Sequence, residues 1–268
     1  MIQAVAEKVS SRLGRDSRII NAARPLYEGV LQALTFGRGV AWSINGIPCR
    51  VDPRCRSAMG KAYDPEAVEF LRRTIRQGSV CYDVGANLGV YAIQFSNMVG
   101  PAGKVVAFEP NPHTLRMLRH HVAINRLSNV HIVAAAAGDK PGSADFFADT
   151  WDGMGRMGAP NERLKDTERF TVPVTTIDRQ VSETGVVPDF MLIDVEGFEI
   201  AVLEGARKTL VEHRATVVVE MHPSVWASAR TDRARAESLL HDLGLRAEAF
   251  LPGKDPLADH CLALLRQA

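Results

Sequence analysis

The stretch VCYDVGANLGVY, residues 80–91, constrains the fold of this chain more than any other segment. An apolar run ends at Asp83, a turn passes through Gly85, and Gly89 precedes a helical pattern, so the sequence predicts a strand, a tight turn and a helix start. Glycines let the backbone come close to a ligand, and the unpaired N–H groups at a helix start attract its polar atoms. The stretch therefore predicts a binding site for a nucleotide-type cofactor.

The spacing of the glycines distinguishes between such cofactors. The dinucleotide fingerprint G-x-G-x-x-G requires glycine at two positions that Asn87 and Val90 occupy here, which disfavours NAD. The segment KVVAFEPN predicts a second strand that ends at Glu109, where a carboxylate can accept hydrogen bonds from a ribose diol. A ribose without a diphosphate indicates S-adenosylmethionine.

Length and charge fit one sizeable enzyme domain with a short appendage. The chain has 268 residues, and its net charge of +1 argues against a dedicated nucleic-acid binder. Residues 1–62 carry ten Lys or Arg against four Asp or Glu, a net +6 that leaves −5 for the remainder. A basic appendage of this kind either contacts an acidic or phosphorylated partner or presents a solvated helical face.

The spacing of the cysteines and the lengths of the apolar runs indicate the cellular compartment of the protein. Cys49, Cys55, Cys81 and Cys261 have neither CxxC spacing nor a disulfide framework, and Cys81 lies in an apolar strand as a core residue. The sequence shows no secretory signal pattern and no run of transmembrane length. We therefore expect a reducing cytoplasm.

The first third of the chain divides into two units. VAWSINGIPCRV, residues 40–51, predicts a hairpin that turns at Asn45-Gly46, after a segment with apolar stripes at helical spacing. Asp64 as N-cap and Pro65 at the first helical position then predict a new helix. We expect a helical and hairpin appendage at residues 1–62, serving as a lid or a dimer element, and an enzyme domain at residues 63–268.

From residue 80 onward, strands and helices alternate, which predicts a seven-stranded, mostly parallel sheet with helices on both faces. The expected strands are residues 80–84, 104–109, 130–135, 190–194, 216–221, 245–250 and 260–265. The last two predict a closing antiparallel hairpin, which is typical of methyltransferase sheets. Helices are expected to begin at Asn111-Pro112 and at Gly197.

The alternation breaks between the third and fourth strands. SADFFA and FTVPV predict an extra strand pair, separated by the long loop 149–168. Loops of this length are usually functional or disordered. Trp151, Met154 and Met157 among glycines therefore form either a flexible wall over a binding site or a mobile surface loop.

Acidic side chains and a histidine follow two strands of the expected sheet. Ligands of open α/β sheets bind beyond the carboxyl ends of the strands, where Asp194, Glu196, Glu220 and His222 should converge with the Gly85 turn. Glu196 could be only a helix cap and His222 only a turn residue, whereas a charge directly after FMLI is costly to bury unless it is used. The remaining histidines, including those at positions 113, 120 and 121, are expected at exposed helix positions.

Methyl transfer to a hydroxyl needs an acceptor in line with the sulfonium carbon and a group that takes the proton. Asp194 is the favoured base, helped by Glu220 and His222. Alternatively, these three side chains hold a divalent cation such as Mg²⁺, which prefers oxygen ligands and lowers the pKa of a bound hydroxyl.

The motifs YDVGANLGVYA, VVAFEPNP, TTID, LIDVEGFEIAVLEGA and VVVEMHP together resemble the FkbM-type methyltransferases over roughly residues 63–222. The resemblance implies a class I, Rossmann-like fold and S-adenosylmethionine as methyl donor. By position, it assigns Asp83, Gly85, Asn87 and Gly89 to the cofactor turn, Glu109 to the ribose and residues 194–196 to the motif after the fourth strand. We expect the cofactor site to consist of Asp83, Gly85, Ala86, Asn87, Gly89, Glu109, Pro110, Asn111, Ala137 and Asp194.

Within that site, we expect Asp83 and the turn amides to hold the methionine moiety, Glu109 the ribose, and backbone near 136–139 the adenine. The resemblance also implies O-methylation of a hydroxyl on a sugar or natural product. N-methylation of an amine or peptide is the alternative among enzymes, and a non-catalytic cofactor-binding protein is the alternative of another class. We expect no nucleic-acid partner, no membrane span, and a homodimer as a possible assembly.

Overall fold

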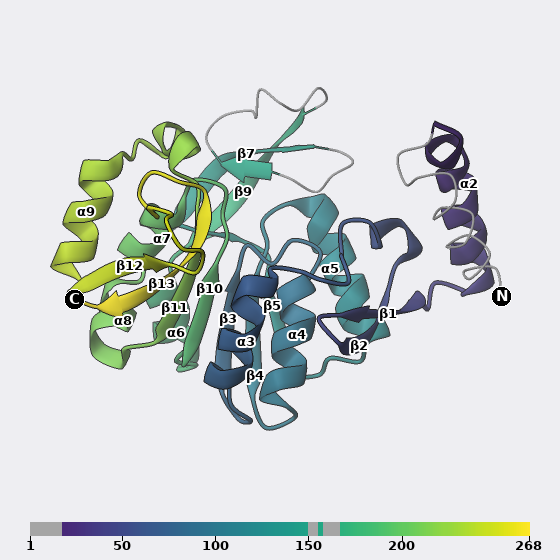
Figure 1. The fold of residues 1–268 in the computed structure, drawn as a ribbon, viewed down its shortest axis with the longest axis horizontal. Coiled ribbons are helices and arrows are strands. Elements are labelled where there is room, and N and C mark those ends of the chain that lie inside the picture. The colour runs from purple at the N-terminus through teal and green to yellow at the C-terminus, as the bar shows by residue number, and fades with distance from the viewer. Residues whose placement is uncertain (1–17, 150–154, 158–166) are drawn as a thin grey trace.

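A computed structural model describes residues 18–149, 155–157 and 167–268 of the chain. The predicted seven-stranded sheet lies at its centre (Figure 1). The strand order is β12, β13, β11, β10, β3, β4, β5, and β13 alone pairs antiparallel with both of its neighbours. The strands are β3 (Val80–Val84), β4 (Lys104–Phe108), β5 (Val130–Val133), β10 (Phe190–Ile193), β11 (Thr216–Met221), β12 (Leu245–Ala249) and β13 (Cys261–Gln267). The expected class I fold with its closing hairpin is confirmed.

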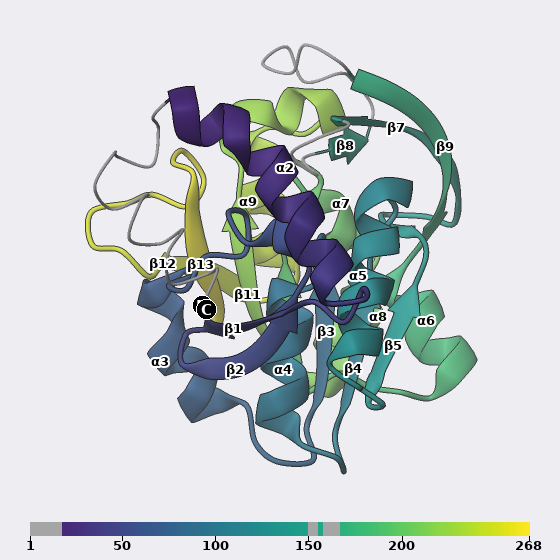
Figure 2. The ribbon, with the colours of Figure 1, turned by 90° about the vertical axis from the view of Figure 1, so that its right-hand side faces the viewer.

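Helices cover both faces of this sheet, as the two views show (Figures 1 and 2). One face carries α3 (Pro65–Thr74), α4 (Val90–Val99) and α5 (Pro112–Ile124), and the other carries α6 (Ile177–Thr184), α7 (Glu199–Glu204), α8 (Arg207–His213) and α9 (Arg233–Asp242). Successive strand residues alternate between the two cores, with Tyr82 packed on one side and Cys81 on the other. Cys81 is fully buried with a free thiol, as its apolar strand predicted.

The segment before the sheet contains α2 (Arg18–Leu34), β1 (Val40–Ile44), β2 (Ile47–Val51) and the short helix η1 (Pro53–Cys55). The predicted hairpin is confirmed, because Asn45 and Gly46 adopt φ angles of +50° and +81° between β1 and β2. Ile44 and Val51 are buried against Ile93 of α4, so the hairpin packs on the helical layer. None of the helices among the described residues is long and apolar enough to cross a membrane.

A second, four-stranded sheet rises above one end of the large sheet (Figure 1). It contains β6 (Ala136–Ala137), β7 (Gly142–Asp149), β8 (Gly155–Met157) and β9 (Thr167–Thr175). The predicted extra strand pair is confirmed as the antiparallel pair β7 and β9. Trp151 and Met154 of the expected wall lie outside the described residues, whereas Met157 is buried in this sheet.

The structure corrects two expectations about the helices. Asp64 does not cap α3 with its side chain; its backbone is left-handed at φ +43° and its carboxylate accepts a 2.5 Å hydrogen bond from the Tyr91 hydroxyl. The expected helix after Gly197 is split into α7 and α8. The break occurs because the Gly205 carbonyl accepts from the Asp178 backbone, and the Asp178 carboxylate caps α8 at the Thr209 amide.

The expectation that the second-helix histidines are exposed is wrong for His121. This side chain is fully buried, its Nδ1 lies 2.7 Å from the Leu88 carbonyl, and its Nε2 accepts from the Asp52 amide at 3.0 Å. The ring therefore joins α5 to the turn before α4 and to the segment after β2. A polar residue can be buried here because both ring nitrogens have partners.

Replacing His121 should destabilise the fold. His121→Leu leaves the Leu88 carbonyl and the Asp52 amide without partners, which costs about 1–3 kcal/mol for each buried group. Because burial lowers the pKa of His121, the unfolded chain binds more protons and the advantage of the wild type should shrink as pH falls below about 6.5. Urea unfolding at two pH values measures both effects. An equal loss in Arg119→Leu, at an exposed position of the same helix, would contradict a specific role for His121.

Gly85 lies where two strand ends meet, at φ +93°, and a Cβ atom there would fall 1.7 Å from the Asp194 carbonyl oxygen. Gly85→Ala should therefore lower the free energy of unfolding by several times the roughly 0.5 kcal/mol of an ordinary surface change. Gly142→Ala is the matched control, because nothing lies within 4 Å of a Cβ atom at that position. Equal urea midpoints for both variants would show that the strand ends can separate freely.

Candidate functional site

The turn between β3 and α4 is held by its own backbone. The Gly85 and Ala86 amides donate to the Phe108 carbonyl, and the Gly89 amide donates to the Ala86 carbonyl. The Asn87 amide, at φ +48°, donates to Glu109. These four amides already have acceptors in the protein. The glycine at position 85 is required by the neighbouring Asp194 backbone, which the glycine pattern alone did not reveal.

Glu109 follows β4 and ties this turn to the start of α5. Its Oε2 accepts from the Asn87 amide at 2.6 Å, and its Oε1 accepts from the Asn111 amide at 2.8 Å. The carboxylate is buried, and burial raises its pKa to about 7 against the opposing effect of these hydrogen bonds. Each carboxylate oxygen can accept more than one hydrogen bond, so the side chain can still bind a ligand diol.

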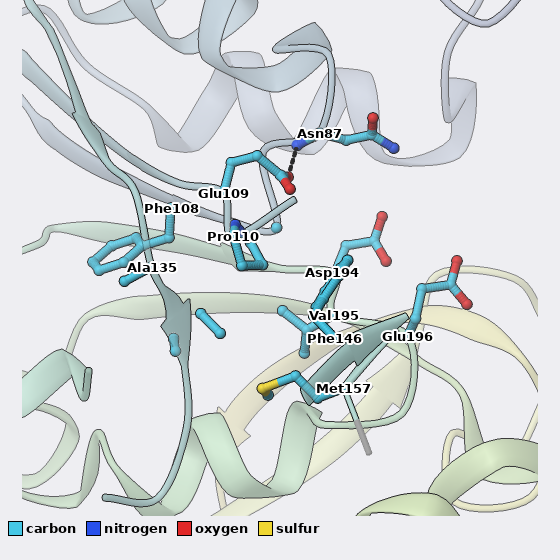
Figure 3. Close-up of a pocket in the computed structure, with 13 residues that line it drawn as sticks. Asn87, Phe108, Glu109, Pro110, Ala135, Phe146, Met157, Asp194, Val195 and Glu196 are labelled. Carbon is cyan, nitrogen blue, oxygen red and sulfur yellow. Dashed lines mark hydrogen bonds between the residues drawn. The ribbon is translucent and has the colours of Figure 1, made fainter. Parts of the chain in front are cut away.

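A hollow opens beside Glu109 at the carboxyl ends of β3, β4 and β10. Figure 3 shows Glu109 and Asn87 on one side of it and Phe146 with Met157 on another. Its lining residues are Gly85, Asn87, Phe108, Glu109, Pro110, Ala135, Ala136, Ala137, Phe146, Met157, Asp194, Val195 and Glu196. The small side chains at 135–137 give it a flat apolar wall. Phe146 and Ala135 belong to the pocket but were not predicted.

Four expected cofactor residues lie behind this lining instead. Asp83, Ala86, Gly89 and Asn111 are buried and are not among the residues that line the hollow. Both carboxylate oxygens of Asp83 lack a hydrogen-bond partner among the described residues. Burial, and then the negative charge of Glu109, raise the pKa of Asp83 to about 7. A buried carboxylate without partners is costly, so this position suits a cationic ligand group.

The acidic residues and the histidine after β10 and β11 come together at the open side of this hollow. Nε2 of His222 lies 4.0 Å from Asp194 Oδ1 and 3.8 Å from the nearest carboxylate oxygens of Glu196 and Glu220. Asp194 and Glu196 also line the hollow, and Figure 3 shows their carboxylates beside each other. The parallel pairing of β10 with β11 brings these residues together. We call Asp194, Glu196, Glu220 and His222 the acidic rim.

Two residues that sequence reasoning missed complete the rim. Glu199, fully buried in the first turn of α7, lies 2.8 Å from Nδ1 of His222. His260, just before β13, lies 2.7 Å from Glu220, and its ring stacks on His222 at 4.5 Å between centroids. Glu199 lies within the LIDVEGFE motif, at the start of a mostly apolar helix. An acidic residue in such a helix is a signal that could have identified it as a site residue. His260 is distant in sequence, and only the antiparallel β13 brings it here.

The pKa values of two residues of the acidic rim, Asp194 and His222, are strongly shifted. Burial, followed by the negative charge of Glu220, raises the pKa of Asp194 well above its usual range. Burial alone would lower the pKa of His222, but the hydrogen bond and charge of Glu199, together with Asp194 and Glu196, outweigh it and raise that pKa to about 9. Perturbed groups in a cleft are typical of catalytic sites.

The rim also has the ligand types of a cation site. Glu220, His222 and His260 form one group, and Asp194, Glu196 and His222 form another, with the candidate ligand atoms of each group within 4.8 Å of one another. Neighbouring acidic groups of this kind are common without an ion. The magnesium alternative, with Asp194, Glu220 and His222 as ligands, therefore stays a prediction.

Comparison with known proteins places this geometry in a family. The Methyltransferase FkbM domain matches residues 83–247. The 2-O-methyltransferase NoeI of Sinorhizobium fredii is 28% identical over 149 residues, covering 50% of this chain and 60% of NoeI. The hexuronic acid methyltransferase AglP of Haloferax volcanii is 27% identical over 164 residues, covering 60% of this chain and 64% of AglP.

The chain thus spans less than two thirds of the length of these two relatives. A solved FkbM methyltransferase from Methylobacillus flagellatus KT is 18% identical, with a TM-score of 0.44 over 73% of this chain and 50% of that one. The matched segment runs from Asp83 of the turn through the acidic rim to β12, and so contains both halves of the site except His260. This chain belongs to the FkbM methyltransferase domain family.

Proposed function

We propose that this protein transfers the methyl group of S-adenosylmethionine to a hydroxyl of a saccharide or related natural product. One observation carries the proposal: Asp194 belongs both to the hollow that contains the ribose acid Glu109 and to the acidic rim around His222. A donor in the hollow and an acceptor at the rim would therefore meet at this residue. When bound, S-adenosylmethionine supplies an electrophilic methyl group on a positively charged sulfur.

The residues of the hollow fit that donor. The Glu109 carboxylate can accept from the ribose hydroxyls, and the apolar wall at 135–137 with Phe146 suits the flat adenine. Behind the lining, the Asp83 carboxylate has no hydrogen-bond partner among the described residues, and its negative charge favours the ammonium of the methionine moiety. Because the amides of Gly85 and Ala86 already donate to Phe108, the Asn87 side chain is the better candidate from this turn for the methionine carboxylate.

The rim favours a hydroxyl as the methyl acceptor. Carboxylates at positions 194, 196 and 220 repel an acceptor that attacks through its own carboxylate, whereas a neutral hydroxyl needs the basic groups that the rim provides. An amine is the second candidate, because the same negative charge attracts an ammonium group. The printed activities of NoeI and AglP direct the acceptor search toward 2-hydroxyls and hexuronic acids.

Several properties of the whole protein stay predictions. These are a cytoplasmic location, a homodimer, the absence of a nucleic-acid partner, and the role of residues 1–62 as a lid or dimer element beside the domain 63–268. The packing of Ile44 and Val51 on α4 supports residues 40–51 as a fixed part of the folded body. Leu31 of α2 packs in the same cluster, but Leu26 and Leu34 of this helix are exposed, so α2 is the better candidate for a pairing element.

A transfer assay tests the function. The protein is incubated with methyl-labelled S-adenosylmethionine and a panel containing methyl glycosides of hexoses, methyl glycosides of hexuronic acids, and aminated sugars. Mass spectrometry then identifies the acceptor and the methylated atom. We expect label on a hydroxyl oxygen. Label on nitrogen would select the alternative activity, and donor binding without transfer to any acceptor would indicate a binding protein.

Glu109→Gln should weaken donor binding by about tenfold or more, since hydrogen bonds to a charged group contribute roughly 1.5–3 kcal/mol. Because the pKa of Glu109 is raised to about 7, the affinity of the wild type should also fall as pH decreases below 7. Calorimetric titration at pH 6 and pH 8 measures both effects. The control is Glu204→Gln, a carboxylate of α7 that pairs with Arg207 instead. Normal donor affinity in a folded Glu109→Gln protein would remove Glu109 from the site.

Asp194→Asn keeps the shape of the side chain and removes a charge where donor and acceptor meet. We expect turnover to fall by about 10²-fold, within the usual range for general-base groups, while donor affinity stays nearly unchanged. Turnover of the wild type after exhaustive chelation separates the two mechanisms. Activity restored by magnesium would support the cation alternative, and unchanged activity would support proton transfer to side chains. Near-normal turnover of Asp194→Asn would remove Asp194 as both base and metal ligand.

A further inference from the structure

The carboxylate of Glu199 is fully buried and is not among the residues that line the donor hollow. It accepts from the Gly197 amide at 2.7 Å and from Nε1 of Trp226 at 2.8 Å, and it lies 2.8 Å from Nδ1 of His222. Burial of a carboxylate is costly unless it is paired in this way. Because both oxygens already accept hydrogen bonds, this arrangement assigns the hydrogen between Glu199 and His222 to Nδ1.

With its hydrogen on Nδ1, the neutral imidazole presents the lone pair of Nε2 to the rim. Nε2 lies 4.0 Å from Asp194 Oδ1, which is too far for a direct hydrogen bond. An oxygen atom placed to one side of the line that joins them can lie about 2.8 Å from each, which is an ordinary hydrogen-bond distance. Both atoms can therefore contact the same acceptor hydroxyl beside the donor hollow.

The ring of His222 is also held on its face. His260 stacks on it with 28° between the ring planes, and His260 is itself 2.7 Å from Glu220. Two carboxylate–histidine pairs thus lie side by side, one buried and one at the surface. A side chain that is fixed at Nδ1 and along its face cannot turn Nε2 away from the rim.

We propose that Glu199 is a positioning residue, which holds His222 so that Nε2 takes the proton of the acceptor hydroxyl. This inference rests on the proposed function. As the acceptor oxygen bonds to the methyl carbon, the bond from that carbon to sulfur breaks and the positively charged sulfur becomes a neutral thioether. The hydroxyl proton moves to Nε2, and His222 later releases it to solvent. Asp194 lies on the other side of the hydroxyl and orients it.

The surroundings of His222 agree with this role. Each element packed around His222 contributes a charged or titratable group. These groups are Asp194 and Glu196 after β10, Glu199 of α7, Glu220 of β11 and His260 before β13. Asp64, before α3, lies near Glu220 and His260. Carboxylates at positions 194, 196 and 220 lie within about 4 Å of Nε2, so they stabilise the positive charge that the ring acquires when it takes a proton.

The test uses Glu199→Gln in the full chain, with Glu204→Gln as the matched loss of a carboxylate from the same helix. The donor is S-adenosylmethionine, and the acceptor is whichever methyl glycoside of the panel the wild type methylates. We expect kcat of Glu199→Gln to fall by about 10²-fold, with the KM for the donor unchanged. A fall in kcat without a change in KM is the result that a positioning role predicts and that general loss of structure does not. Glu204→Gln should match the wild type.

Trp226→Phe keeps the inference testable if Glu199→Gln does not fold. It removes one hydrogen bond from Glu199 and keeps the charge, so kcat should fall by about tenfold, as for supporting residues around other catalytic groups. If the wild type methylates the glycoside but folded Glu199→Gln or Trp226→Phe keeps a normal kcat, the inference is overturned and the proposed function still stands. A wild type that methylates no hydroxyl would overturn the proposed function and this inference with it.

Discussion

The close approach of Gly85 to the Asp194 carbonyl is the contact on which the site depends. The parallel strands β3 and β10 end side by side, and a Cβ atom at position 85 would lie 1.7 Å from that carbonyl oxygen. The contact places the cofactor turn directly against the first residue of the acidic rim. Methyl transfer requires donor and acceptor within a few ångströms of each other, so a glycine here joins the two halves of the site through backbone packing.

A high density of negative charge is the second constraint. Asp83 and Glu109 are buried on the donor side, and Glu199 is buried behind the rim. Glu109 and Glu199 are stabilised by backbone amides and by neighbouring side chains, whereas Asp83 has no such partner among the described residues. The unequal satisfaction of these acids indicates different roles. Glu199 holds protein structure in place, and Glu109 does so while its oxygens keep capacity for ligand hydroxyls. The unsatisfied Asp83 instead suits a positive charge that arrives with a ligand.

The sequence predicted the sheet and its helices closely, because hydrophobic periodicity and turn residues determine both. The DVGAN turn, Glu109 and the residues after β10 and β11 were predicted at the correct end of the sheet for the same reason. Residue spacing could not show that Asp83 and Asn111 lie behind the pocket lining. Nor could it show that His121 is buried, since the partners of His121 are a carbonyl in a turn and an amide in another segment.

The residues that the sequence did not predict reach the site through pairing of strands that are distant in the sequence. Phe146 reaches the donor hollow through the small sheet of β7, β8 and β9, and His260 reaches the rim because β13 runs antiparallel to β11. Both belong to elements outside the turn and strand motifs that line the donor site. The motif residues must fit the donor, whereas the small sheet and the closing hairpin set the shape and charge around the acceptor. Acceptor choice in a protein built this way is expected to depend on Phe146, Met157 and His260 more than on the motif itself.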